Sequence, residues 1–175
     1  MSKLPKIIGD YDAFLRAITA EITAEGFDMT DFVQMDHRCY RTSSLENYTE
    51  KKTQIAEVAE LLGETQVNGR PIATFRLHTP ILFEQWRIDT LELPAPKPSK
   101  ATSEGLEHVE FVLYDSIDAF LDKYKGKEFK LGAADRGINP EVGYNLPSYG
   151  VKFHLLNLPT VVYLESKLGL TEVQS

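Results

Sequence analysis

The residues best suited to chemistry in this chain are its four histidines, each of which lies inside or at the end of a predicted strand. Side chains alternate between the two faces of a strand. In the stretch 105–113, this alternation sends Val109 and Phe111 to one face and His108 and Glu110 to the other. An imidazole beside a carboxylate is suited to binding a divalent metal, moving a proton or holding a ligand through hydrogen bonds.

The same alternation, applied to the other predicted strands, gathers polar side chains on one face of a sheet. An antiparallel sheet often leaves one face in water, so a solvated face without a function is one interpretation. Solvated faces are usually populated by Lys, Glu and Thr, and a face with several imidazoles favours metal or substrate binding instead. The face contains His37, Arg41, Arg76, His78, Glu92, His108, Glu110, Lys152 and His154.

The residues of this face suggest different roles. His37 and His108 are the preferred metal ligands, and Asp36 beside His37 can act as its hydrogen-bond partner. Glu110 can be a ligand, a general base or a surface carboxylate, and we take it as the candidate catalytic base. The candidate substrate-binding residues are the cations Arg41, Arg76 and Lys152, which suit an anionic group, together with His78, which also ends a strand.

Composition narrows the class of protein. The chain has 175 residues, which fits one domain or two small repeats with a shared core. The net charge of −7, from 19 basic and 26 acidic residues, argues against a nucleic-acid partner. The single cysteine, Cys39, excludes an intramolecular disulfide and fits a reducing compartment. With no signal-like N-terminus and no apolar window of about 18 residues, we expect a cytoplasmic protein without a membrane partner.

The predicted elements of the first half follow an N-terminal helical segment, 1–32. Its helix spans 10–25, with Asp10 as the N-cap and Gly26 after its end. A capping box at 43–46 begins a helix that should run to Leu62. The Asn68-Gly69 turn predicts a hairpin. The expected order for a module at 33–93 is strand 33–41, helix 44–62, and strands 64–67, 71–78 and 85–93.

The second half, 105–175, repeats this order after a proline-rich linker at 94–104. Matching His37 with His108 gives a period of 71 positions (108 − 37). The sequence therefore predicts an α+β fold built from two similar modules within a single domain, 1–175. The expected elements are strand 106–113, helix 116–125, strand 128–131, a glycine-rich loop 132–143, strand 150–156 and helix 159–168.

Several stretches together resemble the bacterial YecM family, which is similar in fold to the vicinal-oxygen-chelate superfamily of glyoxalases and extradiol dioxygenases. The resemblance covers roughly 36–165. The stretches are Asn68-Gly69-Arg70-Pro71-Ile72, Leu77-His78-Thr79-Pro80, Leu91-Glu92-Leu93-Pro94, Gly105-Leu106-Glu107-His108-Val109-Glu110 and Lys152-Phe153-His154.

This resemblance implies two βαβββ modules that form a curved mixed sheet around a cleft, with helices on the outer face. It also implies metal ligands on the first and last strands of the modules, which fall on His37, Glu92, His108 and His154. The chain departs from the superfamily at His154, where relatives usually place a carboxylate. Glu165 in the final helix is the alternative residue for that position.

The resemblance and the polar face together predict a divalent-metal-binding protein of the vicinal-oxygen-chelate type. Imidazole and carboxylate ligands suit Zn, Ni, Fe or Mn. Such a metal polarises two neighbouring oxygens of a small oxygenated substrate, as an isomerase, a lyase or a dioxygenase requires. The alternative is a non-catalytic module that binds a small ligand in the same cleft through hydrogen bonds from the histidines. In either case the expected partner is a small molecule, and the protein is a monomer or a homodimer.

Overall fold

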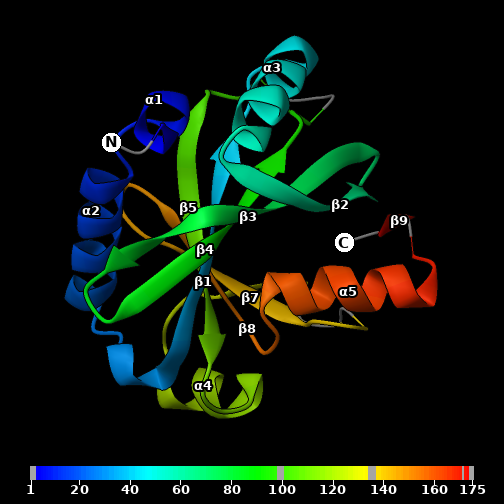
Figure 1. Cartoon of the computed structure of the whole chain (residues 1–175). Coiled ribbons are helices and arrows are strands. Elements are labelled where there is room, and N and C mark those ends of the chain that lie inside the picture. The colour runs from blue at the N-terminus through cyan, green and yellow to red at the C-terminus, as the bar shows by residue number, and fades with distance from the viewer. Residues whose placement is uncertain (1–2, 98–100, 134–136, 171, 174–175) are drawn as a thin grey trace.

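Residues 32–94 form one βαβββ module in the computed structural model, which describes residues 3–97, 101–133, 137–170 and 172–173 (Figure 1). β1 pairs in parallel with β4, and β4, β3 and β2 continue as antiparallel neighbours. The first and last strands of the module are therefore adjacent in the sheet. The module consists of β1 (Phe32–Arg41), α3 (Leu45–Ala56), β2 (Ala59–Val67), β3 (Arg70–Phe83) and β4 (Trp86–Pro94).

A second module repeats this order with β5 (Gly105–Leu113), α4 (Ile117–Lys123), β6 (Lys130–Ala133), β7 (Glu141–Asn145) and β8 (Gly150–His154). β5 pairs in parallel with β8, and β7 and β6 follow as antiparallel neighbours. β1 and β5 pair antiparallel and join the modules. With the short β9 (Glu172–Val173), the described strands form one sheet in the order β6-β7-β8-β5-β1-β4-β3-β2-β9. The predicted pair of βαβββ modules around a cleft is confirmed.

The register between β1 and β5 agrees with the predicted period. His37 lies opposite Glu110, and Cys39 lies opposite His108. Adding 71 to His37 and Cys39 gives 108 and 110, so each pair maps onto the other when the modules are exchanged. A local two-fold axis therefore passes between β1 and β5, at the seam where the two modules meet, and relates their equivalent positions.

The outer face of the sheet carries the core. α1 (Leu4–Ile8), which the sequence did not predict, precedes α2 (Tyr11–Ala24) and a 3₁₀ turn at Met29–Asp31. The N-cap Asp10 is confirmed, because its side chain accepts a hydrogen bond from Ala13 N at 3.0 Å. α2 contacts β5 on this face. Beside α4, an aromatic cluster fills the second module, and its buried rings include Phe27, Phe32, Phe111, Phe120 and Phe153.

The helix of the first module is shorter than predicted. The Ser44 hydroxyl accepts a hydrogen bond from Asn47 N, as the capping box indicates, but α3 ends at Ala56 instead of Leu62. The segment that follows has helix-forming residues, yet it forms the start of β2, where Ala59 lies opposite Leu77 of β3. Pairing with a neighbouring strand overrides a local helical preference. The Asn68-Gly69 turn is confirmed, with φ of 53° and 74°.

Three other predicted boundaries are also wrong. β3 continues past His78 to Phe83, and its pairing with β4 is irregular between Arg76 and Ile81, where Pro80 cannot donate a ladder hydrogen bond. The predicted loop 132–143 contains the end of β6 and the start of β7, while residues 134–136 lie outside the described residues. β8 ends at His154, two residues early. Strand pairing, which is not visible in the sequence, sets these limits.

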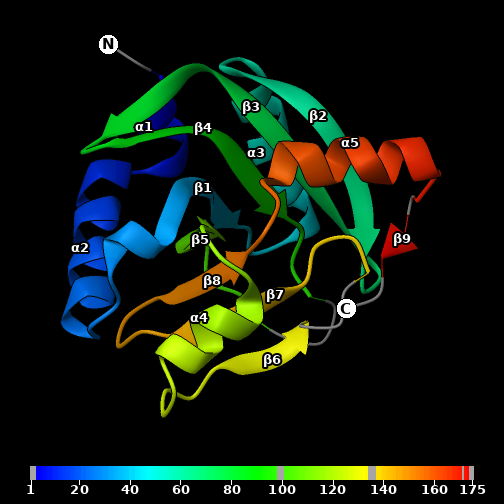
Figure 2. The ribbon, with the colours of Figure 1, turned by 90° about the horizontal axis from the view of Figure 1, so that it is seen from below.

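The last helix, α5 (Leu158–Leu168), differs from the other helices because it lies over the cleft side of the sheet. It contacts β2 and β3, and Figure 2 shows it running alongside these strands. Gly63 of β2 permits this approach, since a Cβ atom at Gly63 would lie 2.8 Å from Val162 Cγ1. α5 thus forms a wall of the cleft that the predicted modules alone do not provide.

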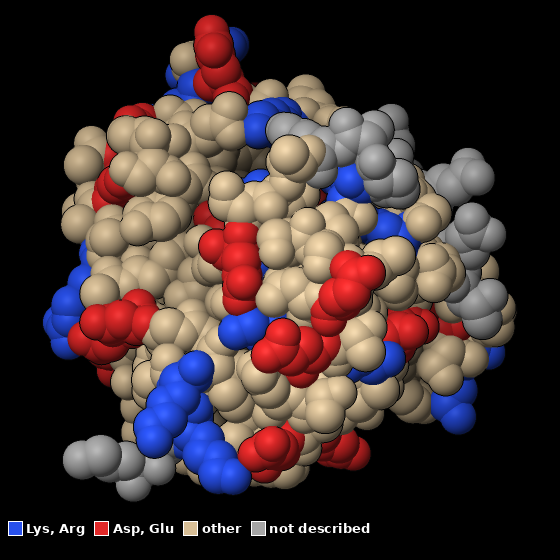
Figure 3. All heavy atoms as spheres, turned by 90° about the horizontal axis from the view of Figure 1, so that it is seen from above, with Lys and Arg blue, Asp and Glu red and all other residues tan. Residues whose placement is uncertain are grey.

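The surface shows no segregation of charge on the face seen from above Figure 1. Figure 3 shows acidic and basic side chains interspersed over this face. Among the described residues, no helix is long and apolar enough to cross a membrane.

We predict that Gly63→Ala destabilises the protein by about 1 kcal/mol, because the new methyl group overpacks the contact with α5. The β-branched Val162 side chain is stiff, so the helix itself must shift. Gly132→Ala is the control, since its new Cβ atom would have no atom of the neighbouring described residues within 4 Å. Urea unfolding of the wild type and the two variants measures the difference. Equal midpoints for Gly63→Ala and Gly132→Ala would contradict close packing of α5 on β2.

Candidate metal centre

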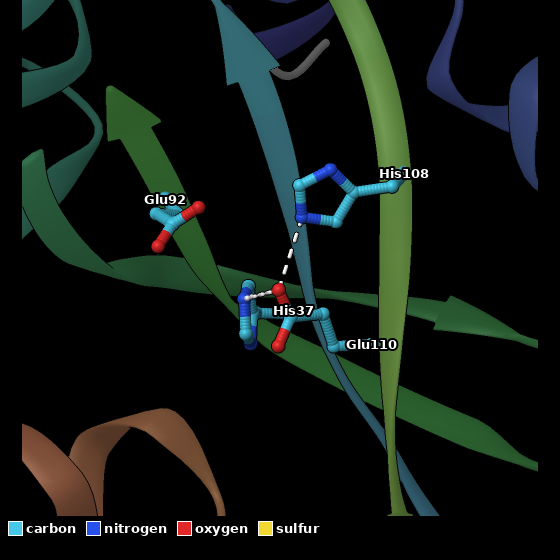
Figure 4. A group of neighbouring side chains, drawn as sticks. All are labelled: His37, Glu92, His108 and Glu110. Atoms are coloured by element: carbon cyan, nitrogen blue, oxygen red, sulfur yellow. Dashed lines mark hydrogen bonds and ion pairs between the residues drawn. The ribbon is translucent and has the colours of Figure 1, made fainter. Parts of the chain in front are cut away.

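Four side chains converge on the cleft side of the seam between the modules. His37 comes from β1, Glu92 from β4, and His108 and Glu110 from β5 (Figure 4). Each offers one nitrogen or oxygen, and these atoms all lie within 4.8 Å of one another. Three of the four predicted ligands, His37, Glu92 and His108, are therefore brought together, and Glu110 completes the group.

Two β-bulges orient the histidines. Along the β1–β5 ladder, Met35 and His37 lie opposite the consecutive residues Phe111 and Glu110, so Asp36 is the extra residue of β1. Tyr40 and Cys39 lie opposite Leu106 and His108, so Glu107 is the extra residue of β5. The two bulges are 71 positions apart (107 − 36) and are equivalent under the two-fold relation. A bulge redirects side chains at one point of a strand.

Each bulge places a carboxylate beside the Nδ1 atom of the following histidine. Asp36 Oδ2 lies 2.9 Å from His37 Nδ1, and Glu107 Oε2 lies 3.5 Å from His108 Nδ1. A carboxylate at Nδ1 fixes the ring orientation and leaves Nε2 for a metal. Both Nε2 atoms point toward Glu110 Oε1, at 3.4 Å from His37 and 3.0 Å from His108 (Figure 4).

Glu110 is a buried anion surrounded by positive or proton-bearing groups. Its side chain is 5% exposed, and Lys152 Nζ lies 2.9 Å from Oε1. His154 Nε2 lies 3.4 Å from Oε2. Burial alone would raise the pKa of Glu110, but Lys152, His37 and His108 hold this pKa well below its usual range. A carboxylate with so low a pKa is a weak proton acceptor, and it stays ionised and able to bind a metal.

The same charges act on the histidines. Burial lowers the pKa of His37, and the carboxylates of Glu110 and Asp36 outweigh it, so the pKa lies well above its ordinary value. The pKa of His108 is also raised, because Glu107 and Glu110 outweigh the burial that lowers it. The stability contributed by protonated His37 is therefore present below about pH 6.5 and is lost as pH rises through the raised pKa.

His154 lies next to this group and not inside it. It forms a second cluster of potential ligands with Asp36 and His37. Neither ring nitrogen of His154 has a hydrogen-bond partner among the described residues. Burial lowers its pKa despite the carboxylates of Glu110 and Asp36. Asp36 Oδ2 also accepts a hydrogen bond from Leu158 N at 2.7 Å, and so connects the cluster to the start of α5.

The donors of the first group fit a divalent transition metal. Metal bonds to histidine nitrogen and carboxylate oxygen are about 2.0–2.2 Å long, so donors around one ion lie up to about 4.4 Å apart. A set of donor atoms within 4.8 Å therefore needs only small movements to close around one ion. The buried Nε2 of His37 has no hydrogen-bond partner in the described part of the chain and lies 3.4 Å from Glu110 Oε1, so it becomes a ligand atom once a metal displaces its proton.

The second module differs from the first at the position on its last strand that corresponds to Glu92. Glu92 lies opposite Cys39 of β1, and Lys152 lies opposite Glu110 of β5. Since Glu110 is the equivalent of Cys39, Lys152 is the structural equivalent of Glu92. The resemblance seen in the sequence placed His154 in this role, two residues further along β8. A cation, not a fourth ligand, occupies the equivalent position.

A cavity of about 740 Å³ surrounds the group. Six of the predicted site residues line it: His37, Glu92, His108, Glu110, Lys152 and His154. Glu165, the predicted alternative to His154, also lines it.

Three predicted substrate-binding residues do not line this cavity. The Arg41 Nε atom lies 3.1 Å from Glu107 Oε2, so Arg41 compensates a carboxylate of the bulge. Arg76 and His78 are exposed on β3, where the irregular pairing with β4 begins. The sequence prediction missed Glu107 and Arg70, which do line the cavity. The acidic residue that precedes both His37 and His108 is the signal that identifies Glu107 as the partner of Asp36.

We predict that Asp36→Asn lowers the pKa of His37 by at least about 1, because an opposite charge beside Nδ1 is removed. The amide oxygen can still accept the hydrogen bond from Leu158 N. Glu107→Gln is the matched variant, and should lower the pKa of His108 by less, since Glu107 is 33% exposed and 3.5 Å away. NMR titration of the imidazole nitrogens in metal-free protein measures both. An unchanged pKa of His37 would contradict the assigned role of Asp36.

Comparison with known proteins places the chain in a family. A curated protein, Protein YecM of Escherichia coli (strain K12), is 29% identical over 155 residues, which are 87% of this chain and 74% of that protein. An uncharacterised Haemophilus influenzae protein is 29% identical over 124 residues, 69% of this chain and 64% of its own length. A solved structure described as "Structural Genomics, Protein EC4020" has a TM-score of 0.76 and 26% identity, with 94% of each chain covered. The family model described as YecM protein matches residues 3–165, so the chain belongs to the YecM family.

Proposed function

We propose that this protein binds one divalent transition metal through His37, Glu92, His108 and Glu110, and presents it to a small oxygenated substrate in the cavity. The observation that carries this proposal is the convergence of four donor atoms within 4.8 Å at the seam. Two imidazoles, which lose their protons when a metal binds, and two carboxylates suit Zn, Ni, Fe or Mn better than Mg or Ca. Nε2 coordination with a carboxylate at each Nδ1 is a common arrangement in metal sites.

The metal and the residues beside its ligands could each take a role in substrate binding or proton transfer. Held by these four residues, a metal would supply Lewis acidity to the oxygens of a bound substrate, which suits isomerase, lyase or dioxygenase chemistry. Lys152 offers a cation beside Glu110 for an anionic substrate group. His154 lines the cavity with an imidazole that is neutral near pH 7, because burial lowers its pKa. It can therefore accept a proton, a role for which the low pKa of Glu110 makes that carboxylate less suited.

We predict that the purified protein takes up about one equivalent of zinc. His37→Ala and His108→Ala should each lower the affinity at least about 100-fold, because each loses a ligand. His78→Ala is the control, since His78 is exposed and does not line the cavity. Metal analysis after reconstitution and chelator competition measures the affinity. Uptake below about a tenth of an equivalent by the wild type would end the metal proposal.

One observation favours the alternative, a binding module without a metal. Lys152 Nζ lies 2.9 Å from Glu110 Oε1 and 3.3 Å from Glu141 Oε1, so a protein cation already compensates Glu110. In such a module the histidines and Lys152 would donate hydrogen bonds to the ligand directly. In the metal-binding function Lys152 competes with the metal for Glu110, whereas in the alternative it takes the place of a metal, and this difference can be tested.

We predict that Lys152→Gln raises the affinity for zinc by about tenfold, because it removes a positive charge that competes for Glu110. Lys125→Gln, an exposed lysine after α4, is the control for net charge. Isothermal titration with zinc measures both variants. In a module that does not use metal, neither the wild type nor Lys152→Gln takes up zinc, and that result would favour the alternative function.

A further inference from the structure

The cavity extends well beyond the metal ligands, along β3 toward the Asn68-Gly69 hairpin. Its volume of about 740 Å³ lies within the range of sites for drug-sized ligands, roughly 300–1,000 Å³. Arg70 and Ile72 of β3 line it, and both have the strand parity of Thr74, which lies opposite Glu92. Arg70 is four positions from Thr74, so at about 3.3 Å per residue it lies about 13 Å along the strand from the metal end.

Apolar side chains from α5 and from the sheet lie between the two ends. Leu158 and Val161 of α5 line the cavity on one side, and Ile72 and Pro94 line it on the sheet. Leu158 and Val161 are three positions apart and lie on one face of the helix. Leu158 is fixed near the metal end by its hydrogen bond to Asp36. A ligand that spans the cavity therefore needs an apolar middle part.

The far end carries the Arg70 guanidinium, which a hydrogen bond positions and no carboxylate of the described residues pairs with. Arg70 Nη1 donates a hydrogen bond to Ala95 O at 2.7 Å, which uses one of its five N–H donors. In the described part of the chain Arg70 forms no ion pair, and Lys97, also on the cavity wall, forms none either. Glu165 is the carboxylate on this part of the wall, and it accepts a hydrogen bond from the Thr65 hydroxyl at 3.2 Å. Counted over these three described side chains, two cations and one engaged carboxylate leave an excess of positive charge.

We propose that the ligand of this cavity is an amphipathic organic anion, with two adjacent oxygens at the metal end, an apolar body beneath α5 and a carboxylate bound by Arg70. The part of this inference that concerns the two oxygens of the ligand rests on the proposed function, and the part that concerns its carboxylate rests on Arg70. A guanidinium pairs with a carboxylate through two parallel hydrogen bonds, which gives direction as well as affinity. Ligand length and charge are thus selected at the end of the cavity remote from the metal.

Three probes separate the contributions of the two ends. They are 4-(3,4-dihydroxyphenyl)butanoate, which has both head and carboxylate, 4-butylcatechol, which lacks the carboxylate, and 4-phenylbutanoate, which lacks the two oxygens. Isothermal titration of zinc-loaded protein measures their affinities for the wild type and Arg70→Gln. Arg87→Gln is the matched control, because Arg87 is exposed on β4 and does not line the cavity.

In the wild type, the carboxylate-bearing catechol should bind about tenfold more tightly than 4-butylcatechol. Arg70→Gln should abolish this difference while the affinities for zinc and for 4-butylcatechol are unchanged, and Arg87→Gln should preserve it. Equal binding of the two catechols by the wild type, or a tenfold preference that survives in Arg70→Gln, would overturn the proposal.

The two proposals fail in different ways. Failure to take up zinc ends the metal function, whereas zinc uptake with no preference for the carboxylate ends only the assignment of Arg70. Titration of metal-free protein with 4-phenylbutanoate tests the far end by itself. Binding that is lost in Arg70→Gln supports the carboxylate site even without a metal, and undetectable binding to both the wild-type and the variant protein counts against it.

Discussion

The cleft depends on the ion pairs and hydrogen bonds that compensate the buried carboxylate of Glu110. A buried charge is costly unless it is compensated, and the compensation here comes from three strands: His37 of β1, His108 of β5 and Lys152 of β8. His37 and Lys152 link β1 and β8 to β5, which carries Glu110, while His108 acts from the same strand as Glu110. The consequence is a polar cluster held in one geometry by charge, inside a sheet whose outer face is held by aromatic packing. A cluster of this kind costs stability, and such costs are commonly found at functional sites.

The two modules are related by a local two-fold axis, which β1 and β5 follow closely and from which β4 and β8 depart at one position. Antiparallel pairing of β1 with β5 places His37 and His108 on either side of one axis, and the equivalent bulges give each ring a carboxylate at Nδ1. The relation breaks at the strands beyond, where Glu92 faces Lys152 across the seam. Equivalent positions of the two modules therefore carry opposite charges, and Lys152 is paired with Glu110 and Glu141.

α5 adds a wall to the cleft side of the open sheet. Gly63 lets the helix approach β2, and Asp36 ties its first turn to the ring of His37. The same carboxylate thus orients a proposed metal ligand and positions the apolar wall of the cavity. This connection links the chemistry at the seam to the shape of the space in which a ligand lies.

The sequence alone determined the two-module fold, the period of 71, and the common face of His37, His108 and Glu110, because strand alternation and helix caps are local properties of the chain. It did not determine where α3 ends or how far β3 extends, because those limits depend on pairing between strands. Nor did it show that Lys152, and not His154, is equivalent to Glu92. That equivalence depends on strand register, and a shift of two residues keeps the same alternation while it changes the neighbours. Only the tertiary structure decided which of the polar side chains meet at the seam and that Arg70 lines the far end of their cavity.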